Sequence, residues 1–185
     1  GDPMKGEKYF EPTKGGHSYA VDLVKQIKAM NAGQFLHETL PMQSTPDFCI
    51  GVAGYPEKHI EAPRLEADLK RLKDKVDAGA DYIVTQMFFD NKRYFKFVEA
   101  ARTIGITVPI IPGIKPVVVK RHLQLLPQEL IHSIEQAKDN AAVRQIGVEF
   151  AVQQSKELIE FGVPCVHYYS MGKSDNIHQI ASQVF

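Results

Sequence analysis

The sequence predicts an α/β fold in which helices alternate with the strands of a parallel sheet. Three observations predict it. Short apolar runs alternate with longer segments whose apolar residues recur at helical spacing. The apolar runs are nearly continuous, which is typical of strands buried on both faces of a parallel sheet. Glycine, proline or aspartate stands at several junctions, where these residues begin or end an element.

The first predicted helix covers residues 19–30, where Ala20 and Val24 begin an apolar stripe at helical spacing. Residues 31–46 are expected to be irregular, because a glycine and two prolines interrupt them. The apolar run at residues 48–53 predicts the first strand. The next helix is expected over residues 63–78, since a proline opens it and a glycine follows it.

The remaining elements continue the alternation. The other predicted strands cover residues 82–89, 108–114 and 164–170. The other predicted helices cover residues 92–103, 143–161 and 175–184. Asp90 is a suitable N-cap for the first of these helices, prolines interrupt the strand at 108–114, and Pro127 breaks the helical region before residue 143.

Four strand–helix repeats fit either an open doubly wound sheet or a (β/α)8 TIM barrel. No Gly-x-Gly-x-x-Gly sequence follows a predicted strand, which weakens the doubly wound dinucleotide-binding interpretation. Four βα units are half of eight, and the chain begins on a loop-like segment, Gly1-Asp2-Pro3. We therefore expect a single domain over residues 1–185 that forms the C-terminal half of a (β/α)8 barrel.

The composition argues against several classes of protein. With 22 basic and 22 acidic side chains, the chain lacks the basic excess typical of general nucleic-acid or membrane-surface binders. No apolar run reaches the roughly 18 to 20 residues that cross a membrane, and residues 1–10 show no signal-peptide pattern. We expect a cytoplasmic protein whose two cysteines, Cys49 and Cys165, are buried and reduced.

Candidate functional residues are those at the carboxyl ends of the predicted strands, where sites of such barrels lie. They are Tyr55, Pro56, Glu57, His59, Glu61, Gln86, Phe88, Asp90, Lys115, His122, Tyr168, Tyr169, Ser170 and Lys173. Asp2 would follow a strand that precedes the chain. No cluster of cysteine and histidine has metal-binding spacing, so no metal site is expected.

Two patterns have a structural interpretation beside the functional one. Gln86 interrupts an apolar run, and a buried amide costs about 1–3 kcal/mol unless its hydrogen bonds are satisfied. Either a ligand or a hydrogen bond within the core would satisfy the amide of Gln86 equally well. Asp68, Arg71 and Lys75 share one helical stripe, for which a solvated, salt-bridged face is the simpler interpretation. From the residues alone, the chain is a barrel-like segment with polar groups on one rim.

Six segments, in order, resemble the methylenetetrahydrofolate reductase family. Gly1-Asp2-Pro3 resembles the end of its Arg-Gly-Asp-Pro loop, and residues 50–62 resemble its Ala-x-Tyr-Pro-Glu-x-His-x-Glu-Ala segment. The other similar segments are residues 19–24, 68–90, 110–114 and 166–169. The resemblance implies a (β/α)8 barrel that binds FAD, is reduced by NADH or NADPH, and converts 5,10-methylenetetrahydrofolate to 5-methyltetrahydrofolate in one-carbon and methionine metabolism. It also implies a folate substrate and a homo-oligomer.

The resemblance implies roles for particular residues. Asp2 and Gln86 match catalytic positions: Asp2 would tune the flavin potential through its charge, and Gln86 would contact folate and nicotinamide. The matching cofactor-binding residues are Gly1, Asp2, Tyr19, Ala20, Tyr55, His59, Ala62, Asp68, Arg71 and Lys75. The matching substrate-binding residues are Gln86, His122 and Lys173. Lys75 would pair with the FAD diphosphate.

The sequence departs from the family pattern at a few positions. Asp74 stands where a basic residue contacts the cofactor, and Arg71 would move the positive charge one helical turn earlier. Lys173 replaces an arginine near the folate, which keeps the charge but loses the bidentate fork. Leu126 falls near a folate-stacking phenylalanine. The family's acidic glutamate and the arginine of Arg-Gly-Asp would precede residue 1.

Two alternatives remain at this stage. The chain could be a non-catalytic barrel fragment that only binds flavin or folate, or that self-associates. It could also be a related barrel with other chemistry, such as a proline dehydrogenase-like flavoenzyme or a pterin-binding methyltransferase. The segments at residues 55–59 and 85–90 argue against this second alternative.

Overall fold

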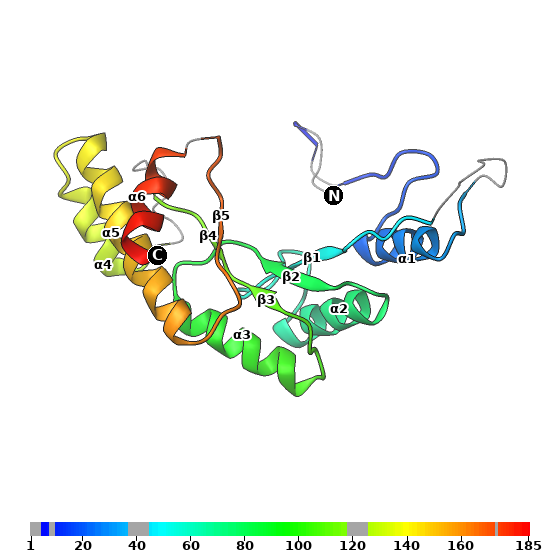
Figure 1. The fold of residues 1–185 in the computed structure, drawn as a ribbon. Helices are drawn as coiled ribbons and strands as arrows, with labels where there is room; N and C mark the ends of the chain where they lie inside the picture. The colour runs from blue at the N-terminus through cyan, green and yellow to red at the C-terminus, as the bar shows by residue number, and fades with distance from the viewer. Residues whose placement is uncertain (1–4, 8–9, 37–44, 118–125, 173) are drawn as a thin grey trace.

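The computed structural model describes residues 5–7, 10–36, 45–117, 126–172 and 174–185. The helices are α1 (Ala20–Asn31), α2 (Leu65–Asp77), α3 (Asn91–Thr103), α4 (Gln128–Glu135), α5 (Asn140–Glu160) and α6 (Asp175–Val184). The strands are β1 (Gly51–Gly54), β2 (Tyr82–Thr85), β3 (Ile110–Ile111), β4 (Gly113–Ile114) and β5 (His167–Tyr168). The predicted alternation of strands and helices is confirmed (Figure 1).

Every strand pair within the described residues is parallel, and the order of the strands follows the chain. One sheet has the order β1-β2-β3, and the other pairs β4 with β5. Pro112 alone separates β3 from β4, and its carbonyl accepts a hydrogen bond from the His167 N–H at 3.0 Å. A doubly wound sheet reverses its strand order at a switch point, and the described strands contain no such reversal. This order agrees with the expected α/β fold of consecutive βα units.

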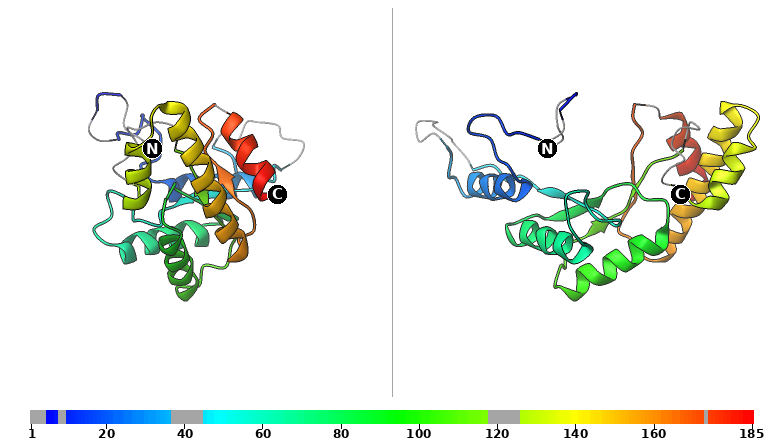
Figure 2. Two further views of the ribbon diagram at one scale, coloured as in Figure 1. Left: turned by 90° about the vertical axis from the view of Figure 1, so that its left-hand side faces the viewer. Right: turned by 180° about the vertical axis from the view of Figure 1, so that it is seen from behind.

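The helices cover one face of the central sheet. Helices α2 and α3 lie on the same side of β1–β3 in opposite views (Figures 1 and 2), and α2 contacts α1 and α3. In β1, Val52 and Gly54 are buried whereas Gly51 and Ala53 are exposed. Burial on both strand faces was therefore a wrong expectation for β1, because the described residues supply a helical layer on one face alone.

The main hydrophobic core lies between the covered face of the sheet and the helices. Ile83, Phe97 and Ile110 are among its most buried side chains. A second cluster, including Phe89, Ile134 and Val143, joins α4 to α5. Gly147 lets α5 approach the chain after β4, because a Cβ there would lie 2.0 Å from the Val117 carbonyl oxygen.

Cys49 and Cys165 are free and exposed, so their expected burial is wrong. Cys49 lies two and four residues before the exposed Gly51 and Ala53, and alternate residues of an extended segment point to the same side. Cys49 therefore shares the side that the helices leave uncovered. Within the described part of the chain, no helix is both long enough and apolar enough to span a bilayer.

Several element boundaries differ from the sequence expectation. The strands are shorter than the apolar runs, since pairing of β2 ends at Thr85 while Phe88 and Phe89 continue into the core. Helix α5 begins at Asn140, ahead of the expected start at 143, because the Asp139 carboxylate caps it by accepting from the Ala142 N–H at 2.8 Å. The predicted cap at Asp90 is confirmed by its 2.9 Å hydrogen bond from the Lys92 N–H.

Candidate functional site

The candidate site lies where the parallel strands end, because their carboxyl ends meet at one edge of the sheet. The loop 55–62 follows β1, and Gln86 directly follows β2. The Gln86 N–H donates to the Gly54 carbonyl at 2.8 Å, so the ends of these two strands are joined. Tyr169 follows β5 at the same edge.

Backbone and side-chain contacts fix His59 in the loop 55–62. Its N–H donates to the Asp68 carboxylate at 2.9 Å, and its ring packs edge-on against Tyr55 with centroids 4.6 Å apart. The Glu61 N–H donates to the ring Nδ1 of His59 at 3.2 Å. In the neutral ring Nδ1 is then the acceptor, so Nε2 carries the proton and is the donor for a ligand.

Two residues of the α2 stripe face this loop and the end of β1. Asp68 is 9% exposed and receives the His59 N–H. The Lys75 ammonium donates to the Ala53 carbonyl at 2.6 Å. Arg71, in contrast, is exposed. The interpretation of this stripe as a solvated face is therefore right for Arg71. It is wrong for Asp68 and Lys75, which hold the end of β1 and the loop after it.

Burial lowers the pKa of Lys75 from its ordinary value, while the nearby Asp68 carboxylate acts in the opposite direction. The ammonium is half-buried, so it has lost part of its hydration without a full countercharge. A second anion beside Lys75 would offset that loss. This side chain is the strongest candidate anion partner in the stripe.

Gln86 is exposed, contrary to the expectation of a buried amide. The strand ends at Thr85, and the chain then leaves the sheet, which carries the side chain out of the core. Its Oε1 accepts from the Met87 N–H at 3.0 Å. The amide nitrogen donates no hydrogen bond to another described residue. Its two N–H groups therefore remain available for a ligand at the strand edge.

A tyrosine ties β5 to the end of β2. The Tyr169 hydroxyl donates to the Thr85 carbonyl at 2.9 Å, and the Gly113 N–H donates to the Thr85 hydroxyl at 2.9 Å. Glycine is required at 113, because a Cβ would lie 2.2 Å from the Thr85 carbonyl oxygen. Burial raises the pKa of Tyr169. The contact supports the residue directly before Gln86, and the sequence identified Tyr169 only as a residue of the rim.

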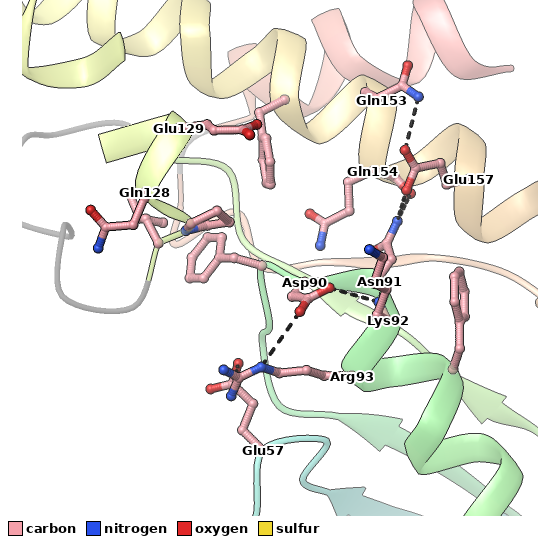
Figure 3. Close-up of a pocket in the computed structure, with 15 residues that line it drawn as sticks. Glu57, Asp90, Asn91, Lys92, Arg93, Gln128, Glu129, Gln153, Gln154 and Glu157 are labelled. Atoms are coloured by element: carbon pink, nitrogen blue, oxygen red, sulfur yellow. Dashed lines mark hydrogen bonds and ion pairs between the residues drawn. The ribbon is translucent and has the colours of Figure 1, made fainter. Parts of the chain in front are cut away.

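A cavity of about 630 Å³ opens beside the same edge, between the start of α3 and helices α4 and α5 (Figure 3). Glu57 and Arg93 form an ion pair at 3.3 Å on its border. The Asn91 amide donates to the Gln154 carbonyl and the Glu157 carboxylate at 3.1 and 2.8 Å. Sequence analysis did not identify this cavity, because its walls come from segments about 60 residues apart.

The predicted site residues thus separate into groups. The structure brings together Tyr55, His59, Ala62, Asp68, Lys75 and Gln86 at the ends of β1 and β2. Tyr19 and Ala20 are exposed at the start of α1, and Arg71 is exposed on α2. Gly1, Asp2, His122 and Lys173 lie outside the described residues. Among the described residues, no three acidic, histidine or cysteine side chains gather as a metal site.

A family model and the named relatives of this chain carry the same family name. A family model described as Methylenetetrahydrofolate reductase matches residues 1–184. An Arabidopsis thaliana protein named Methylenetetrahydrofolate reductase (NADH) 1 is 39% identical over 189 residues, covering 92% of this chain and 30% of the relative. A Caenorhabditis elegans protein named Probable methylenetetrahydrofolate reductase (NADPH) is 41% identical over 143 residues, covering 72% and 22%. This chain therefore spans less than a third of either relative.

One solved structure is similar in fold. It is an uncharacterized protein from Clostridium thermocellum, described as binding two copies of 5-methyl-5,6,7,8-tetrahydrofolic acid. The TM-score is 0.50 at 19% identity, over 75% of this chain and 53% of that chain. At this identity the likeness bears on the fold alone.

Proposed function

The chain belongs to the methylenetetrahydrofolate reductase family, and from this premise we propose that it forms part of a flavin-dependent catalytic barrel. The proposed reaction reduces 5,10-methylenetetrahydrofolate to 5-methyltetrahydrofolate with NADH or NADPH. The observation that supports it best is the group formed by the loop 55–62, Asp68, Lys75 and Gln86 at the ends of β1 and β2.

The residues of this group fit an FAD site. Lys75 offers a half-buried ammonium whose lost hydration a diphosphate would offset. The His59 Nε2–H is a donor for a ring or phosphate oxygen, and the exposed Arg71 adds positive charge on the same helix. When bound, FAD supplies the redox chemistry, and the protein positions and tunes it.

Gln86 is the proposed contact for folate and nicotinamide. Its exposed amide carries both donors and an acceptor, which suits the alternating donors and acceptors of a pteridine edge or a carboxamide. Asp2, His122 and Lys173 are further proposed contacts, and Gly1, Tyr19 and Ala20 are further proposed cofactor contacts. These six assignments rest on the resemblance to the family.

We also propose that the uncovered face of the sheet faces the interior of a closed (β/α)8 barrel, with residues 1–185 as its C-terminal half. The consecutive parallel strand order supports this arrangement, as does the exposure of Gly51 and Ala53 on one face. We likewise propose that the protein is cytoplasmic and that it forms a homo-oligomer.

A second candidate function is a non-catalytic fragment that binds flavin or folate, or that self-associates. The observation that favours it is the exposed sheet face, because uncovered strands invite pairing with another chain. Sedimentation of the purified chain tests self-association: a monomer contradicts it, whereas a concentration-dependent oligomer supports it.

The proposed activity is tested by the oxidation of NADH and of NADPH with menadione as electron acceptor, in the presence of FAD. Turnover that requires added FAD supports the flavin-dependent reductase. Flavin binding without turnover supports the non-catalytic candidate. Turnover with one nucleotide and not the other assigns the physiological donor.

A further inference from the structure

Lys58 has an unusual backbone conformation within the loop 55–62. Its φ is 78°, and Lys58 and Met171 are the residues other than glycine with positive φ in the described part of the chain. A side chain with a Cβ is unfavourable in this region. A lysine held there needs contacts that outweigh the local preference.

The Lys58 side chain supplies such contacts. Its ammonium donates to the His59 carbonyl at 3.0 Å and to the Ala62 carbonyl at 2.6 Å. The Ala62 N–H donates to the same His59 carbonyl at 3.0 Å, and the Lys58 N–H donates to the Tyr55 carbonyl at 3.1 Å. Hydrogen bonds from a charged donor are stronger than neutral ones. The Lys58 ammonium therefore joins His59 to Ala62, the two ends of the second half of the loop.

The residues on both sides of Lys58 are anchored to different helices. Glu57 pairs with Arg93 of α3 at 3.3 Å (Figure 3), and the His59 N–H bonds to Asp68 of α2 at 2.9 Å. Between these anchors the loop has no helix or strand to define its path. The ammonium of Lys58 therefore adds a second internal connection between His59 and Ala62, beside the hydrogen bond from the Ala62 N–H to the His59 carbonyl.

We propose that Lys58 is a positioning residue, which holds the loop 55–62 in the arrangement that presents Tyr55 and His59 to FAD. The inference rests on the proposed function for the identity of the ligand. Lys58 acts through the loop, since both carbonyls that its ammonium binds belong to that loop. It is thereby distinct from Lys75, whose ammonium binds the end of β1.

The test compares Lys58→Met, Lys58→Gly and Lys58→Arg with the control Lys70→Met, which removes an exposed lysine of α2. Hydrogen exchange of the loop amides is measured on each full chain without ligand, and the Kd for FAD by titration. Lys58→Met is expected to speed exchange at Ala62 and to raise the Kd about tenfold or more, equivalent to about 1.4 kcal/mol. Lys70→Met leaves both quantities unchanged.

The other two variants separate the hydrogen bonds from the backbone preference. Lys58→Gly removes the unfavourable φ together with the ammonium, and it is expected to weaken FAD binding as Lys58→Met does. Lys58→Arg keeps a charged donor, so exchange at Ala62 is expected to be slower than in Lys58→Met. If Lys58→Gly binds FAD as well as the unaltered chain, the ammonium does not position the loop and the inference is overturned.

Failure of the proposed function has a different signature. If the unaltered chain binds no FAD, the proposed function fails and exchange alone decides the role of Lys58. Faster exchange at Ala62 in Lys58→Met, with an unchanged melting temperature, then supports the role in holding the loop. Unchanged exchange overturns it. Where the unaltered chain does bind FAD, an equal FAD affinity of Lys58→Met overturns the inference as well.

Discussion

At the residue scale, the site depends on charged side chains that bond to the backbone. Asp68 receives the His59 N–H, and Lys75 donates to the Ala53 carbonyl. Each places a formal charge beside a strand end or loop where a ligand is proposed to bind. Because burial lowers the pKa of Lys75, the charged form of this side chain carries a free-energy cost in the ligand-free chain.

Replacement of Lys75 tests that interpretation. A group whose pKa is lowered by folding contributes stability that is complete above its unfolded pKa, near 10.4 for lysine, and that is lost as the pH falls through its folded pKa. Lys75→Met removes both this cost and the hydrogen bond to the Ala53 carbonyl, so it is expected to change the ligand-free stability at pH 7 by no more than about 1 kcal/mol, while it raises the Kd for FAD about tenfold or more. Urea unfolding and FAD titration measure the two effects. A destabilised variant with unaltered FAD affinity would show that Lys75 serves the fold alone.

The lowered pKa of Lys75 also predicts a pH dependence of binding. An anionic diphosphate favours the ammonium, so binding above the ligand-free pKa of Lys75 takes up a proton. FAD affinity should accordingly fall as the pH rises through that pKa, and this fall should be smaller in Lys75→Met. FAD titrations from pH 7 to about pH 10 check the difference, and parallel curves for the two proteins would contradict it.

At the element scale, tyrosine hydroxyls connect strands to neighbouring elements. Tyr94 of α3 donates to the Ile110 carbonyl of β3 at 2.7 Å, and Tyr169 donates to the Thr85 carbonyl of β2 at 2.9 Å. Tyr168 shares a 2.8 Å hydrogen bond with Ser155 of α5. Of these bonds, the one from Tyr169 fixes the end of β2, which Gln86 directly follows.

Tyr94 predicts a loss of stability in alkaline solution. Burial raises the pKa of its hydroxyl, the nearby Cys165 adds to the rise, and Arg102 opposes it. A group whose pKa is raised by folding contributes stability that is complete below its unfolded pKa, about 10 for tyrosine, and is lost as the pH rises above it. Urea midpoints above pH 10 should fall less steeply in Tyr94→Phe, and an unchanged slope would contradict this role.

Tyr169→Phe tests the support beneath Gln86. Removal of the hydroxyl leaves the Thr85 carbonyl without its donor, which should cost about 1–2 kcal/mol of the free energy of unfolding. Tyr19→Phe is the matched control, because Tyr19 is 68% exposed. Urea unfolding at pH 7 compares the two. Equal stability of both variants would mean that the Tyr169 hydroxyl does not hold the end of β2.

Sequence patterns predicted the elements better than their ends and surroundings. The helix periodicity and the caps act locally, so α2, α3 and the Asp90 cap followed from neighbouring residues. The apolar run at 82–89 predicted a longer strand than β2, which ends at Thr85. The apolar residues after Thr85 pack in the core without pairing with a neighbouring strand. The same run misplaced Gln86 in the core, since hydrophobicity does not show where a chain leaves a sheet.

The candidate site was only partly predictable for a related reason. Spacing placed Asp68 and Lys75 on one helical stripe, but it could not show that this stripe faces the loop after β1. The left-handed conformation of Lys58 and its two carbonyl contacts depend on the closed loop. Lysine has no particular preference for that conformation, so no local signal in the sequence predicted it.

At the scale of the whole molecule, a consecutive parallel sheet carries an outer helical layer on one face and the candidate site at its strand ends. The strand order and the helix contacts follow the chain from α1 through α3. One edge of this arrangement carries the loop 55–62, Gln86 and Tyr169 from three different strands. We propose that these groups bind a flavin in the chain as it stands.

The most direct test is the visible absorption spectrum of the purified chain after incubation with FAD and desalting, with Lys75→Met and Lys70→Met treated in parallel. The unaltered chain and Lys70→Met are expected to retain the absorption bands of bound flavin, while Lys75→Met is expected to lose most of them. A colourless unaltered chain would contradict the claim that the described strand ends form a flavin site.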